Sequence, residues 1–114
     1  MLSKLTKFTI ETIKIKKMNK FEIQNSILTF YLYGRADGFN SEAIDKEIDS
    51  CIDENIKSMV LDLGNVDYIS SAFLRVCIKL MKKFEKENFS IVNVQPTVLK
   101  VFKIANFTEI INIQ

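Results

Sequence analysis

The sequence predicts a single α/β domain, in which helices pack on a mixed β-sheet that opens with an antiparallel hairpin and continues with central parallel strands. Two short strand-like runs come first, and amphipathic helical patterns then alternate with buried strand-like runs. The chain has 114 residues, which is enough for one core. With 47% hydrophobic and 26% charged residues, its composition is that of an ordinary folded domain.

The first elements are two strands joined by a turn. Residues 21–24 alternate apolar and polar side chains, and residues 27–33 are rich in β-branched and aromatic residues. Between these runs, Asn25 and Ser26 have the chemistry of a turn. Two glycines then bracket a loop at 34–38. An antiparallel hairpin followed by a loop is therefore expected.

An amphipathic helix and a buried strand come next. Apolar residues recur with helical spacing over residues 41–55, and Ser41 has the chemistry of an N-cap. Residues 58–63 form a nearly continuous apolar run, which is typical of a central strand buried on both faces. The turn-prone Gly64 ends this run, so a loop is expected at 64–69.

The remaining pattern repeats this alternation. A second helix is predicted to begin at the serine pair 70–71, because apolar residues recur with helical spacing over 73–84. Residues 89–94 indicate a second buried strand, parallel to the first because a helix long enough for a crossover separates them. Pro96 suits the first turn of a third helix, and residues 110–113 close the chain as a short strand or helix end.

The start of the chain differs from the rest in charge. The first 20 residues hold six lysines and one glutamate, a charge of +5, so the other 94 residues carry −3 of the total of +2. We predict a basic N-terminal appendage over 1–17 and a folded domain over 18–114. The appendage is either a solvated tail or start-site artefact, or a contact for a membrane surface or nucleic acid. Direct nucleic-acid binding is not expected, because no aromatic platform interleaves with the lysines.

Several function classes are excluded by composition. The chain has no histidine, which removes Ser-His-Asp triads and histidine-ligated zinc sites. It has no glycine-rich phosphate loop, and Cys51 and Cys77 fit reduced core thiols better than a metal pair or a disulfide. No run approaches the length of a membrane span or of a signal-peptide core. We therefore expect a cytoplasmic protein that is not an enzyme and uses no metal or cofactor.

One segment combines polar chemistry with a special position. Asp67 to Ala72 lies where a buried strand leads into a helix N-terminus, which offers free N–H donors and about half a positive charge. A phosphate group would be stabilised there. Serines that begin a helix are also often simple caps, so on the residues alone both interpretations remain open.

The same region carries a resemblance to a known family. Residues 61–76 resemble the signature of the STAS domain, in which a buried strand and a loop are followed by Asp-Ser or Ser-Ser, a small residue and a helix. Gly34-Arg35-Ala36-Asp37 resembles the Gly-x-x-Asp that follows the family's second strand. The resemblance covers about residues 21–114 and includes a last strand at 92–94 and a helix at 101–107.

The resemblance implies an anti-sigma factor antagonist that acts by partner switching. Such a protein binds an anti-sigma factor or serine kinase and frees the factor that the kinase held. Ser71 aligns with the phosphoacceptor, and Ser70 stands where many members have Asp. The implied partner-binding surface comprises Asp37, Asp67, Ser70, Ser71 and Phe73. Phosphorylation would reverse binding by placing negative charge on this surface.

The chain departs from the family at Phe73, where members usually have Gly. An exposed Phe73 would indicate an altered partner, whereas a buried one, which the helical spacing favours, would mean local repacking. The alternative function is a non-phosphorylated STAS subunit of a lipid-transport or transporter-associated complex. A serine- or lysine-dependent enzyme is disfavoured, because no oxyanion motif occurs. The sequence leaves open whether the protein forms a homodimer.

Overall fold

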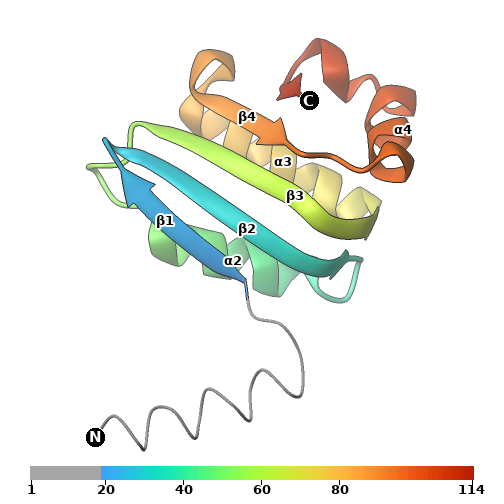
Figure 1. Ribbon diagram of the computed structural model, residues 1–114, viewed down its shortest axis with the longest axis horizontal. Coiled ribbons are helices and arrows are strands. Elements are labelled where there is room, and N and C mark those ends of the chain that lie inside the picture. Colours follow the sequence, from blue (N-terminus) through green and yellow to red (C-terminus); the bar gives the residue numbers. More distant parts are fainter. Residues whose placement is uncertain (1–18) are drawn as a thin grey trace, which may run out of the picture.

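The computed structural model describes residues 19–114, which fold as one sheet with helices packed on it. In this part of the chain, five strands follow the spatial order β1-β2-β3-β4-β5. The pair β1–β2 is antiparallel and the other pairs are parallel (Figure 1). The strands are β1 (Lys20–Gln24), β2 (Ile27–Ala36), β3 (Ser58–Ile69), β4 (Phe89–Val92) and β5 (Asn112–Ile113). The predicted class, with its opening hairpin and central parallel strands, is confirmed.

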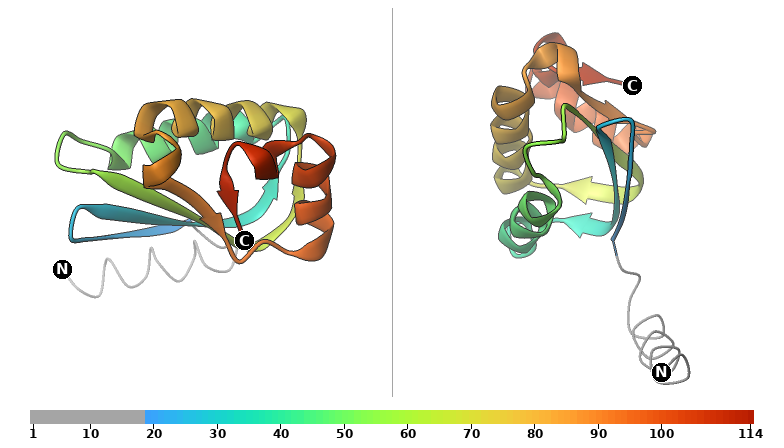
Figure 2. Two further views of the ribbon diagram at one scale, coloured as in Figure 1. Left: turned by 90° about the horizontal axis from the view of Figure 1, so that it is seen from above. Right: turned by 90° about the vertical axis from the view of Figure 1, so that its left-hand side faces the viewer.

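The helices α2 and α3 cover one face of the sheet, and α4 lies near the end of the molecule that holds the C-terminus (Figure 2). Two short 3-10 helices complete the described elements. The helices are α2 (Ser41–Cys51), α3 (Ser71–Phe84), α4 (Pro96–Ile104), η1 (Lys86–Asn88) and η2 (Phe107–Glu109). The basic segment 1–17 and the next residue lie outside the described residues.

The core forms where the inward faces of the strands meet the apolar stripes of the helices. In β2, the alternation of side chains sends Leu28, Phe30 and Leu32 inward, all 1% exposed or less. The stripe of α3 is buried as predicted and consists of Phe73, Val76, Cys77, Leu80 and Phe84. Together these side chains belong to a single hydrophobic cluster.

The strand β3 is longer than predicted. The sequence favours a loop at 64–69, but the pairing of β2 with β3 continues as far as Ala36 and Ile69. The register skips one residue of β3 at each of two bulges, and the second extra residue is Asp67. Bulges absorb extra residues without ending a strand, so turn-prone residues remain inside β3. As a result, β2 and β3 end side by side.

The helix α2 is shorter than predicted and has a different cap. Asn40, not Ser41, is the N-cap residue, and Ser41 is a buried residue of the first turn. The Ser41 hydroxyl donates to the Asp37 carbonyl at 2.6 Å, so it binds the preceding turn instead of capping α2. The helix ends at Cys51 because Ile52 is extended, with φ −98° and ψ 126°.

The last elements also differ slightly from the prediction. The strand β4 ends at Val92, two residues before the predicted end, and only Asn112–Ile113 of the final segment form a strand. Asn93 has a positive φ of 58°, which is incompatible with the continuation of an extended strand. The third helix begins at Pro96, as expected.

Both cysteines are free thiols. Cys77 is fully buried in the core, and the loss of solvation raises its pKa far above the ordinary range for a thiol. Cys51 is half-buried at the edge of the core, and burial raises its pKa as well. The assignment of the cysteines as reduced thiols that pack with the core is confirmed.

Candidate functional site

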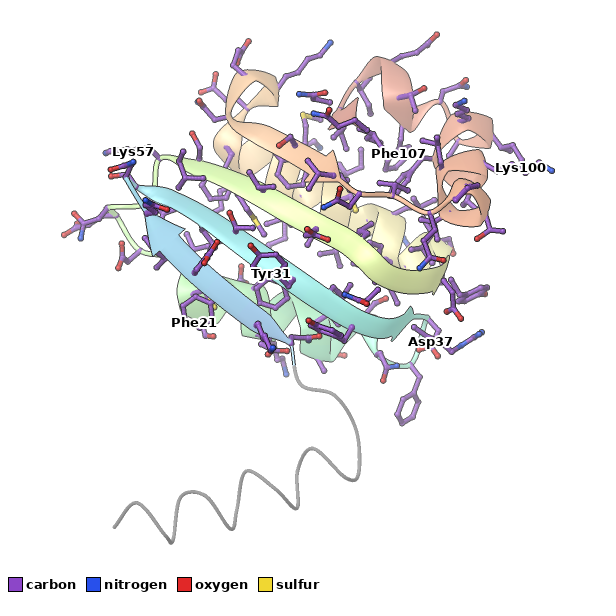
Figure 3. The ribbon with its side chains drawn as sticks, in the orientation of Figure 1. Phe21, Tyr31, Asp37, Lys57, Lys100 and Phe107 are labelled. Carbon is purple, nitrogen blue, oxygen red and sulfur yellow. The ribbon has the colours of Figure 1, made fainter. Side chains whose placement is uncertain are left out.

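The candidate site lies at the carboxyl ends of β2 and β3, the end of the sheet where Figure 3 labels Asp37. The Ser70 backbone N–H donates to the Ala36 carbonyl at 2.9 Å, which joins the start of α3 to the end of β2. Gly34 has a φ of +96° just before the second bulge, a conformation that glycine adopts without strain. The paired strands therefore bring the turn 37–40 next to the serine pair, at an edge where α/β proteins commonly bind ligands.

Ser70 caps α3. Its backbone is extended, with φ −112° and ψ 171°, and its side-chain oxygen accepts a hydrogen bond from the Phe73 backbone N–H at 3.3 Å. This bond satisfies one of the N–H groups that every helix leaves unpaired in its first turn. The expectation that Ser70 serves as the cap is confirmed.

We predict that Ser70→Ala lowers the free energy of unfolding by about 1 kcal/mol, because the first turn of α3 loses its side-chain acceptor. Urea denaturation followed by circular dichroism measures the change. Ser71→Ala is the matched control and should stay within about 0.5 kcal/mol of the parent, because its hydroxyl is exposed. An equal loss in both variants would show that Ser70 has no special capping role.

Ser71 is the first residue of α3 and is exposed. Its hydroxyl makes no hydrogen bond to any other residue of the described range 19–114. The backbone N–H groups and the dipole of α3 give this position a positive potential. Arg75 lies four residues later, on the same side of the helix, and is exposed as well. The geometry thus offers a free nucleophilic oxygen in surroundings that favour an anionic group.

Asp37 reaches the same edge from the turn after β2, and its side chain is 30% exposed. One carboxylate oxygen accepts from the Asn40 backbone N–H at 2.8 Å, and the other lies 3.9 Å from the Arg35 Nε. Asp67 is exposed on the second bulge of β3, three residues before the cap. The structure therefore places both carboxylates and both serines around the paired ends of β2 and β3.

Phe73 does not belong to this surface. The sequence analysis included it among the partner-binding residues, but its side chain is 0% exposed and lies in the core. The third position of α3 points toward the sheet, because it continues the apolar stripe of the helix. A partner that binds the folded protein cannot touch this ring, so the replacement of the family's Gly is an internal repacking.

Three exposed residues at the same edge were missed by the sequence analysis. The Arg35 guanidinium lies over the Tyr68 ring, 4.2 Å from its centroid, and Tyr68 is 42% exposed. Phe39 is 91% exposed in the turn 37–40. The sequence contains one usable signal for Phe39, a large aromatic residue between Gly38 and Asn40, outside any apolar periodicity.

The described part of the chain has neither a cluster of metal-binding side chains nor a helix suited to span a membrane. Within residues 19–114, His, Cys, Asp and Glu side chains form no cluster that could hold a metal ion. In the same range, no helix combines the length and apolar character that crossing a bilayer requires.

The fold, with its paired strand ends at this edge, is that of a known protein family. The family model described as "STAS domain" matches residues 19–114, so the chain belongs to the STAS domain family. It is an anti-sigma factor antagonist-like member of that family. It is 34% identical over 88 residues to BtrV of Bordetella bronchiseptica, a protein provisionally named an anti-sigma factor antagonist. That match covers 75% of this chain and 76% of BtrV.

Solved structures show the same fold. An anti-sigma factor antagonist from Mycobacterium paratuberculosis superposes with a TM-score of 0.75 at 18% identity, covering 84% of this chain and 83% of that one. The phosphorylated form of SpoIIAA, a Bacillus cell fate determinant, gives a TM-score of 0.63 at 17% identity, covering 85% of this chain and 91% of that one. The names of these relatives describe a regulatory role.

Proposed function

We propose that this protein is a partner-switching regulator controlled by phosphorylation of Ser71. In its unphosphorylated form it binds an anti-sigma factor or serine kinase through the surface around Asp37, Asp67, Ser70 and Ser71. The observation that supports this most is the exposed hydroxyl of Ser71 at the start of α3, which makes no hydrogen bond within residues 19–114, in an anti-sigma factor antagonist-like STAS protein. The partner and the kinase are proposed by similarity to the named relatives.

The chemical step belongs to the kinase. The Ser71 Oγ attacks the γ-phosphorus of ATP, a new O–P bond forms, the bond to the β-phosphate oxygen breaks and ADP leaves. The hydroxyl proton passes to a base of the kinase, so this chain needs no catalytic residue of its own. Because the step needs ATP and a bacterial serine kinase, the expected location remains the cytoplasm.

The folded domain tolerates the product. A phosphoserine carries a charge of about −1.5 to −2, and a helix N-terminus stabilises such a charge. The exposed Arg75, one turn further along α3, supplies a cation at the spacing that favours an ion pair. We therefore expect phosphorylation to leave the fold intact and to act on binding.

Release of the partner follows from charge. The two carboxylates of Asp37 and Asp67 already flank the serine pair, and Asp67 forms no ion pair within the described part of the chain. The exposed Arg35 and Arg75 balance these two charges, so a phosphate added at Ser71 gives this edge a net negative charge of about −1.5 to −2. A partner that presents the phosphates of a bound nucleotide, or acidic side chains, to this edge is then repelled.

Mapping the phosphate by mass spectrometry tests the proposal. The protein is incubated with ATP and a serine kinase of the partner-switching type from its own organism, called the partner kinase below. We expect one phosphate, on Ser71, in both the parent and Ser70→Ala, and none in Ser71→Ala. Phosphate on Ser70 alone would refute the assignment. Phosphate on neither serine, with a kinase shown to be active, would favour the alternative of a non-phosphorylated STAS subunit of a transport complex.

A further inference from the structure

Phe39 is the most exposed of the large hydrophobic side chains in the described part of the chain. It is 91% exposed, whereas the next, Ile104 on α4, is 77% exposed. A phenylalanine in water forgoes the stabilisation that burial of its ring would provide. Loop residues carried by a rigid scaffold often serve in binding, so the exposure of Phe39 indicates a contact with a partner.

The turn that carries Phe39 is firmly held. The Asn40 backbone N–H donates to the Asp37 carboxylate at 2.8 Å, and the Asn40 side chain donates to the Arg35 carbonyl at 3.2 Å. On the other side, the Ser41 backbone N–H and hydroxyl donate to the Asp37 carbonyl at 3.0 and 2.6 Å. Phe39 is thus presented by an ordered turn, and binding through it requires little loss of loop entropy.

The strand ends next to the turn 37–40 carry residues of the types that form binding hot spots. Arg35 stacks on Tyr68, with its guanidinium carbon 4.2 Å from the ring centroid, and its Nε lies 3.9 Å from Asp37. Tyr68 is itself 42% exposed. Aromatic residues and arginine are enriched at the centres of protein interfaces, where a surrounding rim excludes water. Asp37 links this group to the turn that holds Phe39.

This group lies on the edge that also carries Ser71. The Ser70 N–H bonds to the Ala36 carbonyl, one residue from Asp37 and three from Phe39. A partner large enough to cover the phosphorylatable serine therefore meets the turn as well, since a standard interface buries about 800 Å² on each side. The exposed ring continues the surface proposed above for the partner.

We propose that Phe39 is the apolar anchor by which this protein binds its anti-sigma factor or serine kinase. The inference rests on the proposed function and adds the chemistry of the partner: an apolar pocket that takes the ring. At the rim of that pocket are hydrogen-bond acceptors that face the N–H groups of Arg35. Ser71 then controls a complex whose affinity comes largely from a ring that carries no charge.

The affinity of the unphosphorylated protein for the partner kinase, measured by isothermal titration calorimetry, tests this anchor. Phe39→Ala should weaken binding about 10- to 100-fold, since it removes the burial of one ring. Ile104→Ala is the matched control, because it also truncates an exposed apolar side chain but lies on α4. It should change the affinity less than about twofold, and both variants should melt at the parent's temperature.

The outcomes separate the anchor from the function on which it rests. If the parent binds and is phosphorylated on Ser71 but Phe39→Ala binds equally well, the anchor is refuted and the proposed function stands. If the parent neither binds nor accepts phosphate, both fail together. If sedimentation shows that the parent self-associates and Phe39→Ala does not, the ring contacts a second copy, and the anchor for the kinase is likewise refuted.

Discussion

Phe73→Ala is expected to destabilise the domain by about 3–5 kcal/mol, the largest effect of any single substitution considered. The Phe73 side chain is 0% exposed and packs in the core between α3 and the sheet. Its truncation removes the burial of the ring and leaves a cavity that a close-packed interior fills only in part. Because a domain of this size is stable by about 5–15 kcal/mol, the variant should lose a large fraction of its stability.

Urea denaturation of the parent, Phe73→Ala and Phe73→Leu measures this effect. Leucine keeps most of the apolar volume, so we expect it to cost less than about 1.5 kcal/mol. Phe39→Ala is the control, because it deletes the same ring from a position that is 91% exposed, and it should cost at most about 0.5 kcal/mol. A similar loss at both positions would contradict the assignment of Phe73 to the core.

The sequence predicted most of the fold because its strongest signals are local. The apolar stripe of α3 depends only on helical spacing, and it correctly favoured a buried Phe73. The hairpin β1–β2 follows from two runs and the turn at Asn25 and Ser26, which both adopt positive φ. The cap of α3 follows in the same way from a serine placed directly before an apolar stripe.

The errors arose where structure depends on a distant segment. The continuation of β3 through 64–69 requires a paired β2 to hold the bulges, and no residue of β3 signals this alone. Ser41 resembles a cap in sequence, but its hydroxyl binds the Asp37 carbonyl, which the turn brings within 2.6 Å. In both places, tertiary contacts outweighed the local structural preference of the residues.

The candidate site was predicted in part. The family resemblance pointed to Ser71 and Asp37, and the paired ends of β2 and β3 bring their segments together. It could not reveal the stacking of Arg35 on Tyr68, because these residues meet only through the register that pairs them across two strands. The exposure of Phe39 likewise depends on how the turn 37–40 is held.

Ser71→Asp is expected to weaken the complex with the partner kinase by about 10-fold, whereas Ser71→Ala should bind like the parent. The carboxylate adds a full negative charge to a surface whose two carboxylates are balanced by two arginines, and like charges at an interface cost several kcal/mol when they are desolvated. Alanine removes only an exposed hydroxyl that makes no hydrogen bond within the described residues. Titration calorimetry with the three proteins measures the difference.

Asn55→Asp is the matched control for added charge. Asn55 is exposed in the turn before β3, at the end of the sheet opposite to the candidate site, so the substitution adds the same charge far from Ser71. It should leave the affinity within about twofold of the parent. Ser71→Asp should slightly stabilise α3, so a loss of affinity confined to this variant would not reflect unfolding. Equal losses in both variants would indicate a general charge effect.

The decisive measurement for the switch is the dissociation constant of the complex with the partner kinase, determined for the same protein before and after stoichiometric phosphorylation. We expect that the phosphate, with about twice the charge of aspartate, weakens binding about 100-fold or more, and that phosphatase treatment restores it. Ser71→Ala, treated in parallel, should keep its affinity throughout. A phosphorylated protein that binds as tightly as the unphosphorylated one would contradict the proposed switch at Ser71.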